Sequence, residues 1–139
     1  MSGPTEKQLV GVKMMHEFFG EDLFNALRSN SRDDLPSQVG VEYLAEVCFS
    51  SYARPGLDFK SRSLMNLGML IALNRGPELR IHIKAALNNG LSEQQICEAC
   101  RHAMIYCGVP AGRDALTIAS DVFEETKAAN KRAGGPKLV

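Results

Sequence analysis

Signals that start and stop α-helices recur at short intervals along this chain, and they constrain its fold more than any other feature. Gly20 follows a stretch whose apolar residues have helical spacing, and Pro36 suits the first turn of a later helix. Pro77 follows Gly76 in the same way, and Ser92-Glu-Gln-Gln95 has the pattern of a capping box. β-Branched residues nowhere alternate with polar ones over more than a few positions, so no strand is predicted. The sequence therefore predicts an all-α protein of about seven helices.

These helices are expected to form one domain. A chain of 139 residues has the length of a single ordinary domain with one core. We therefore predict one helical domain over residues 1–133 and a flexible tail over residues 134–139. The predicted helices cover residues 6–19, 21–28, 36–51, 58–74, 76–89, 92–107 and 110–132.

The charges of the chain balance, which limits the partners it can attract. Lysine plus arginine and aspartate plus glutamate number 16 each, so no global field draws nucleic acid or an anionic membrane to the protein. No run approaches the roughly 18 apolar residues of a membrane span, and residues 1–13 lack the continuous apolar segment of a signal peptide. We expect a cytoplasmic protein that binds a small molecule or another protein.

Several apolar side chains favour self-association. Apolar residues make up 45% of the chain, and the phenylalanines Phe18, Phe19 and Phe24 occupy positions that look exposed. A homo-oligomer is therefore the expected state.

The predicted helix over residues 58–74 is apolar almost all round, and Asp58 can cap it. Such a helix is expected to be central and buried. Arg62 and Asn66 stand out in it, one turn apart on the same face. A charge in an apolar helix needs an internal partner, a route to solvent for its charged end, or an anionic ligand. The residues leave these possibilities open.

Glu78 and His82 lie four residues apart in the next predicted helix and therefore share one face. With Ala85 and Asn89 they form a stripe along the edge of the apolar face. One interpretation is a surface pair that stabilises the helix by a few tenths of a kcal/mol. The other is an acid–base pair, because a carboxylate and an imidazole at a core edge shift each other's pKa.

The helix over residues 92–107 carries two further patterns. Cys97, Cys100 and Cys107 recur with Met104 at the spacing of a buried seam, so core packing is predicted, with free thiols and no structural zinc. His102 and Tyr106 follow Glu98 at steps of four residues on the opposite side. They are predicted either to be exposed or to line the same pocket as His82.

Five segments together resemble the carboxymuconolactone decarboxylase family, which shares its fold with the alkylhydroperoxidase AhpD-like proteins. They are Arg54-Pro-Gly-Leu-Asp58, Arg62-Ser-Leu64, Glu78-Leu-Arg-Ile-His-Ile-Lys-Ala-Ala86, Asn89-Gly90 and Tyr106-Cys-Gly-Val-Pro-Ala111. The resemblance spans residues 40–123 and implies an all-α domain that assembles as trimers or hexamers. It also implies conversion of 4-carboxymuconolactone to a β-ketoadipate enol-lactone with loss of carbon dioxide.

This chemistry implies roles for particular residues. The electrons left by the departing carboxylate spread onto the lactone carbonyl of the substrate itself, so no cofactor or metal is expected. The protein then needs an anchor for the remaining carboxylate and an acid for the ring carbon. The resemblance assigns Arg62 as the anchor, His82 as the acid and Glu78 as the group that orients and charges His82. Substrate contacts are expected from Asn66, Tyr52, His102 and Tyr106.

Two positions bear on other functions. The Cys-x-x-Cys motif of the peroxidase branch would place its cysteines at positions 75 and 78, where this chain has Arg75 and Glu78, and this absence argues against peroxidase chemistry. Tyr52 stands where the family usually has tryptophan, which leaves the substrate open. One alternative is a thiol-dependent peroxide reductase that uses Cys97 and Cys100. The other is a non-catalytic oligomeric protein that binds small molecules.

Overall fold

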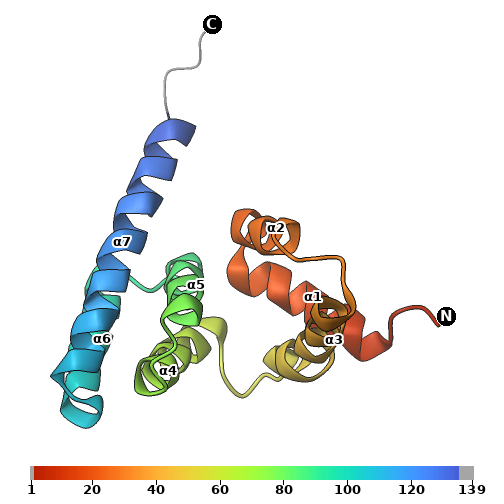
Figure 1. Cartoon of the computed structure of the whole chain (residues 1–139), viewed down its shortest axis with the longest axis horizontal. Helices are drawn as coiled ribbons and strands as arrows, with labels where there is room; N and C mark the ends of the chain where they lie inside the picture. The colour runs from red at the N-terminus through yellow and green to blue at the C-terminus, as the bar shows by residue number, and fades with distance from the viewer. Residues whose placement is uncertain (1, 135–139) are drawn as a thin grey trace, which may run out of the picture. The chain divides into compact units, whose positions relative to one another are not determined.

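The computed structural model describes residues 2–134, and within them the protein contains seven α-helices and no strand (Figure 1). The prediction of an all-α fold is confirmed. The helices are α1 (Glu6–Phe19), α2 (Glu21–Ser29), α3 (Leu35–Tyr43), α4 (Phe59–Ala72), α5 (Gly76–Asn88), α6 (Glu93–Cys107) and α7 (Val109–Ala133). A π-helical turn, η1 (Leu44–Phe49), and a 3₁₀ turn, η2 (Ser50–Ala53), follow α3.

The chain divides into two compact units, Met1–Arg62 and Ser63–Val139. The single domain proposed for residues 1–133 stays a prediction. The tail predicted for residues 134–139 lies, from residue 135 onward, outside the described residues. No helix in residues 2–134 combines the length and the apolar character needed to cross a membrane.

Local capping interactions set several helix ends where the sequence places them. Ser92 accepts a hydrogen bond from the backbone N–H of Gln95, whose side chain bonds back to the backbone N–H of Ser92, so the predicted capping box is present. Asp58 likewise accepts from the backbone N–H of Ser61 at the start of α4. Gly108 ends α6 with φ of 90°, a conformation that favours glycine.

The predicted helix over residues 36–51 is interrupted. It divides into α3, η1 and η2, and both η1 and η2 pack on α1. Gly11 of α1 approaches Ala45 of η1 so closely that a Cβ atom at Gly11 would overlap the Ala45 carbonyl oxygen. The π turn thus lies where two backbones meet, a contact between segments far apart in the sequence.

Aromatic side chains form the interior of the first unit. Phe18 and Phe19 are buried, and the ring of Phe18 makes edge contacts with Phe49, Tyr52 and Phe59. The expectation that Phe18 and Phe19 are exposed is therefore wrong. They pack inside the unit because α1 turns this face toward η1 and η2.

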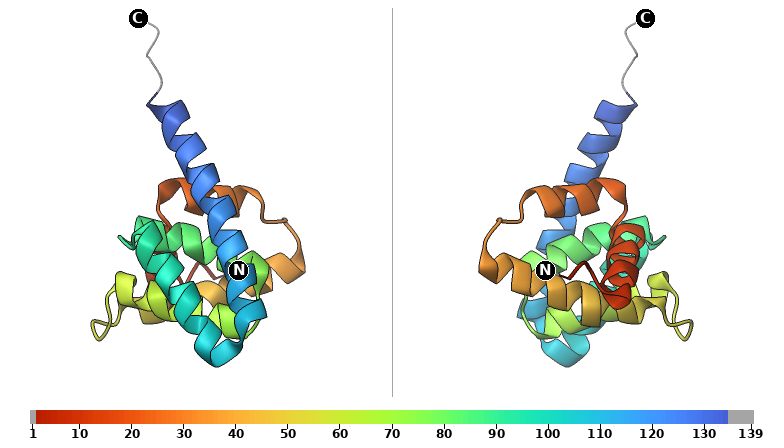
Figure 2. Two further views of the ribbon diagram at one scale, coloured as in Figure 1. Left: turned by 90° about the vertical axis from the view of Figure 1, so that its left-hand side faces the viewer. Right: turned by 90° about the vertical axis from the view of Figure 1, so that its right-hand side faces the viewer.

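An aliphatic core holds the second unit together. Its members come from all four helices and include Leu67, Ile83, Ile96, Cys100 and Val122. Small residues let α6 and α7 approach: a Cβ atom at Gly112 would lie 2.9 Å from the Cys100 carbonyl oxygen. The end of α7 extends beyond α6 (Figures 1 and 2).

The helix α4 is less buried than its composition predicts. Only Ser63, Leu67 and Ile71 are buried in it. Four of its large apolar side chains are exposed, namely Leu64, Met65, Met69 and Leu73. The expectation of a helix buried all round is wrong, because the core of the second unit covers one face of α4.

Candidate active site

The helix α5 presents a stripe of side chains at the edge of the core. Pro77 occupies its first turn, where a missing N–H leaves no helical hydrogen bond unmade. Leu79, Ile83 and Ala86 join the core, which turns Glu78 and His82 toward the boundary of that core. His82 is half-buried and Ala85, one turn later, is fully buried. The predicted stripe therefore belongs to a partly covered face.

Asn66 of α4 meets His82 of α5. The side-chain nitrogen Nδ2 of Asn66 lies 3.5 Å from Nδ1 of His82. An amide nitrogen donates hydrogen bonds and does not accept them, so Nδ1 can accept this bond only when it carries no proton. The structure thus brings together two of the residues singled out in the sequence.

Burial decides the charge of His82. It lowers the pKa of the imidazole, and the nearby Glu78 carboxylate opposes this shift. The net direction is down, so the ring is neutral at pH 7. The Glu78 carboxylate acts in the expected direction, but the desolvation of the ring outweighs its attraction, and the role assigned to Glu78 stays a prediction.

Glu78 itself stays ionised. A hydrogen bond from Arg75 and one from its own backbone N–H hold the pKa of its carboxyl group below the ordinary value. The Arg75 Nη2–Glu78 Oε1 distance is 2.7 Å. Oε2 is shielded from solvent and accepts no hydrogen bond from any residue that the structure describes. It is an open acceptor beside the site.

A second polar pair joins α4 to the end of α5. The Asn89 amide donates to the hydroxyl of Ser63 over 2.9 Å, and Ser63 is fully buried. Ser63 and Arg75 have no role in the sequence-based prediction. The available signal for Ser63 was its position three residues before Asn66 in a largely apolar helix.

Arg62 and Tyr52 lie in the first unit and contact each other. The guanidinium of Arg62 donates to the backbone carbonyls of Leu57 and Arg54, each over 3.0 Å, and its Cζ lies 5.4 Å from the centre of the Tyr52 ring. Carbonyl oxygens and an aromatic face thus hold this cation, and it forms no ion pair with a carboxylate in residues 2–134. Its role as a carboxylate anchor stays a prediction.

His102 and Tyr106 are both exposed on α6, with ring centres 5.6 Å apart. Of the two predicted alternatives for these residues, exposure to solvent is therefore the one observed. Substrate contact by either residue stays a prediction. Burial raises the pKa of the Cys100 thiol to about 11, and Cys97 and Cys107 pack against the same core. This agrees with the predicted seam. The described residues contain no cluster of three or more His, Cys, Asp or Glu side chains suited to a metal ion.

Comparison with known proteins decides the family. The profile of the carboxymuconolactone decarboxylase family matches residues 41–121. The chain belongs to this family. The matched range contains each candidate residue of both units, from Tyr52 to Tyr106, and the resemblance predicted from the sequence is confirmed.

Two proteins that are similar to this chain are named as decarboxylases. A nitrosuccinic acid decarboxylase of Metarhizium robertsii is 35% identical over 117 residues, covering 83% of this chain and 80% of that protein. A 4-carboxymuconolactone decarboxylase of Acinetobacter baylyi is 33% identical over 118 residues, covering 83% of this chain and 85% of that protein. These two relatives support a decarboxylase-like function for this member of the carboxymuconolactone decarboxylase family.

Proposed function

We propose that this protein removes carbon dioxide from a small acid that holds the remaining electron pair on one of its own oxygens. The observation that carries the proposal is the half-buried His82, which contacts Asn66 of α4 and lies one turn after the Glu78 carboxylate on α5. This group lies in the range matched by a family with decarboxylase relatives.

The names of the two relatives suggest the substrate class. A nitrosuccinic acid and a carboxymuconolactone share little in shape. In each, however, a carboxylate can leave from a carbon joined or conjugated to an oxygen-bearing acceptor, a nitro group or a lactone carbonyl. The common requirement is an electron acceptor built into the substrate, which removes the need for an added one.

The proposed reaction balances with one proton. The bond between the carboxylate carbon and its neighbour breaks, carbon dioxide leaves, and the electron pair moves to the nitro or carbonyl oxygen. A proton then reaches the carbon, and the electrons return from the oxygen to form the new carbon–hydrogen bond. His82 is the proposed donor of this proton.

His82 must acquire the proton that it donates. An anionic substrate beside the ring favours the imidazolium form, and the Glu78 carboxylate acts in the same direction. Substrate binding therefore raises the pKa of a ring that burial keeps neutral in the free protein. Glu78 stays ionised through this step because Arg75 holds it.

Carbon dioxide release from paired compounds tests the proposal. Nitrosuccinate and 4-carboxymuconolactone are compared with succinate and with the saturated lactone, which lack the acceptor or its conjugation. We expect turnover only where the acceptor is present. His82→Gln should lower kcat by about 100-fold or more, whereas Asn88→Ala, an exposed position on the same helix, should not.

Two results would overturn the proposal. One is an absence of carbon dioxide release from every compound. The other is a His82→Gln variant that keeps kcat within about tenfold of the wild type, because a general acid contributes more than that. Circular dichroism of both variants checks that the helices are intact.

A further inference from the structure

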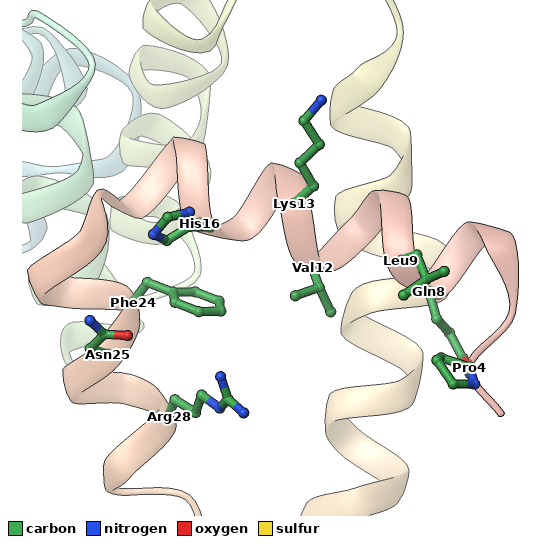
Figure 3. A pocket seen from close by; sticks show the side chains of 9 residues that line it. All are labelled: Pro4, Gln8, Leu9, Val12, Lys13, His16, Phe24, Asn25 and Arg28. Carbon is green, nitrogen blue, oxygen red and sulfur yellow. The ribbon is translucent and has the colours of Figure 1, made fainter.

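A groove in the first unit lies outside the range that defines the family. Its volume is ≈ 570 Å³, and it is lined by side chains of α1 and α2 and by Pro4 (Figure 3). All of them precede residue 41, where the family match begins. None of these lining residues belongs to the candidate active site, so the groove is a separate feature of the protein.

The turn between the two helices shapes this groove. Gly20 ends α1 with φ of 80° and sends the chain back as α2. Leu9, Val12 and His16 share one face of α1, while Phe24 and Arg28 share one face of α2 at a four-residue step. These two faces are the ones that line the groove.

The wall along α1 is apolar and open. Leu9 is 57% exposed and Val12 is 42% exposed, although both are aliphatic. Across from them the ring of Phe24 contacts His16 edge-on, with ring centres 5.0 Å apart. An apolar ligand body would remove this surface from water.

The polar end of the groove is cationic. Figure 3 shows Arg28 extending from α2 beside Phe24 and Asn25, while Lys13 extends away from them. Lys13 is also within 4.0 Å of the Glu17 carboxylate. No aspartate or glutamate lines the groove, and no carboxylate of residues 2–134 forms an ion pair with Arg28. The guanidinium has a planar pair of N–H donors suited to a carboxylate.

We propose that this groove binds a small amphipathic carboxylate, with its apolar body against Leu9, Val12 and Phe24 and its carboxylate on Arg28. The volume falls within the range of about 300–1,000 Å³ typical of small-molecule sites. The groove is positively charged at one end and apolar along its wall. This favours a ligand with one negatively charged part and one apolar part. The proposal does not rest on the decarboxylase reaction at His82.

Titration of the full chain with 4-phenylbutyrate, followed by amide NMR, tests this site. The matched probes are 4-phenylbutan-1-ol, which keeps the apolar body without the charge, and acetate, which keeps the charge alone. We expect saturable shifts confined to α1 and α2 for the carboxylate, and binding at least about tenfold weaker for each matched probe.

Variants separate the anchor from general charge. Arg28→Gln should weaken 4-phenylbutyrate binding by about tenfold, whereas Arg32→Gln, a matched exposed arginine after α2, should change it by less than about twofold. Val12→Glu places a carboxylate on the wall and should abolish binding. His82→Gln should bind the probe as the wild type does, which keeps this result independent of the proposed reaction.

Several outcomes would overturn the proposal. They are equal binding of the acid and the alcohol, unchanged binding by Arg28→Gln, shifts centred outside α1 and α2, and no binding at all. Tighter binding of a poly-glutamate peptide than of 4-phenylbutyrate would show a surface for acidic protein segments in place of a small-molecule site.

Discussion

The Asn66 amide lies 3.5 Å from Nδ1 of His82, and this contact joins α4 to α5 at the half-buried imidazole. The amide nitrogen can donate to this ring nitrogen only while the ring nitrogen carries no proton. When His82 gains a proton at Nδ1, two donors would face each other, so the Asn66 side chain must turn its Oδ1 toward the ring. The same residue can therefore hold either form of the imidazole, at the cost of one rotation.

We expect Asn66→Asp to raise the pKa of His82. A carboxylate of the same size accepts from the protonated ring and adds an opposite charge beside it, so the pKa should rise by about 1 or more. NMR titration of the ring proton measures it, with His82→Gln to assign the signal. An unchanged pKa would show that position 66 does not contact the ring in solution.

The stability of the protein should respond to pH through His82. Burial lowers the pKa of this ring in the folded state, so the unfolded chain, whose histidine has a pKa of about 6.5, binds the proton first as the pH falls. The free energy of unfolding should therefore decrease below pH 6.5, until the lower pKa of the folded state is reached. Urea unfolding at several pH values measures it.

The comparison variant for this pH effect is His82→Gln, which cannot take up the proton. Its free energy of unfolding should fall less than that of the wild type between pH 7.5 and pH 5. Parallel curves for the two proteins would mean that the His82 ring is as well solvated in the folded state as in the unfolded chain.

Ser63→Ala should destabilise the second unit by about 1–2 kcal/mol. The substitution removes the acceptor of the Asn89 amide, which then lies half-buried beside a methyl group. Ser120→Ala, at an exposed position of α7, should change the free energy of unfolding by less than about 0.5 kcal/mol. Chemical unfolding of the three proteins at one pH makes the comparison, and equal stabilities would argue against the Ser63–Asn89 bond.

Gly11→Ala should destabilise the first unit by about 3 kcal/mol or more. The added methyl group would overlap the Ala45 carbonyl oxygen, and backbone atoms cannot rotate away as a side chain can. Gly40→Ala is the matched change within α3, where a Cβ atom meets nothing within 4 Å, and it should stabilise by about 0.4–1 kcal/mol. Thermal unfolding distinguishes them, and similar effects would contradict the close approach of α1 and η1.

Cys100 should resist alkylation in the folded protein. Its thiol is buried and its pKa is raised to about 11, so very little thiolate forms at pH 8. Mass spectrometry after a short iodoacetamide treatment should find Cys48, Cys97 and Cys107, which are partly exposed, modified before Cys100. Rapid modification of Cys100 would contradict this prediction and would support the alternative function of a thiol-dependent peroxide reductase.

The predicted helix boundaries agree with the structure wherever a local interaction sets them. The Ser92 capping box, the Asp58 cap and the stops at Gly20 and Gly108 each involve residues within four positions of one another, so the sequence carries the whole interaction. The break after Tyr43 was not predicted. It lies where the α1 backbone, more than thirty residues earlier, presses against Ala45.

For the stripe of Glu78 and His82, some properties likewise follow from the local sequence and others from tertiary packing. Its spacing on α5 follows from the sequence, and so does its position beside the apolar face. Its contacts with Asn66 and its degree of burial come from α4, which lies at a distance along the chain. The pKa direction of His82 could not be predicted from spacing, because a neighbouring carboxylate and desolvation act in opposite senses.

By itself the sequence determined the all-α class, the ends of most helices, the family and the helix that carries His82, because these depend on short-range patterns. Only the tertiary structure decided that Phe18 and Phe19 are buried, that one side of α4 is exposed and that burial outweighs Glu78 at the imidazole. These properties depend on which helix faces cover one another. That choice is made by packing between segments distant in the chain, and no local pattern records it.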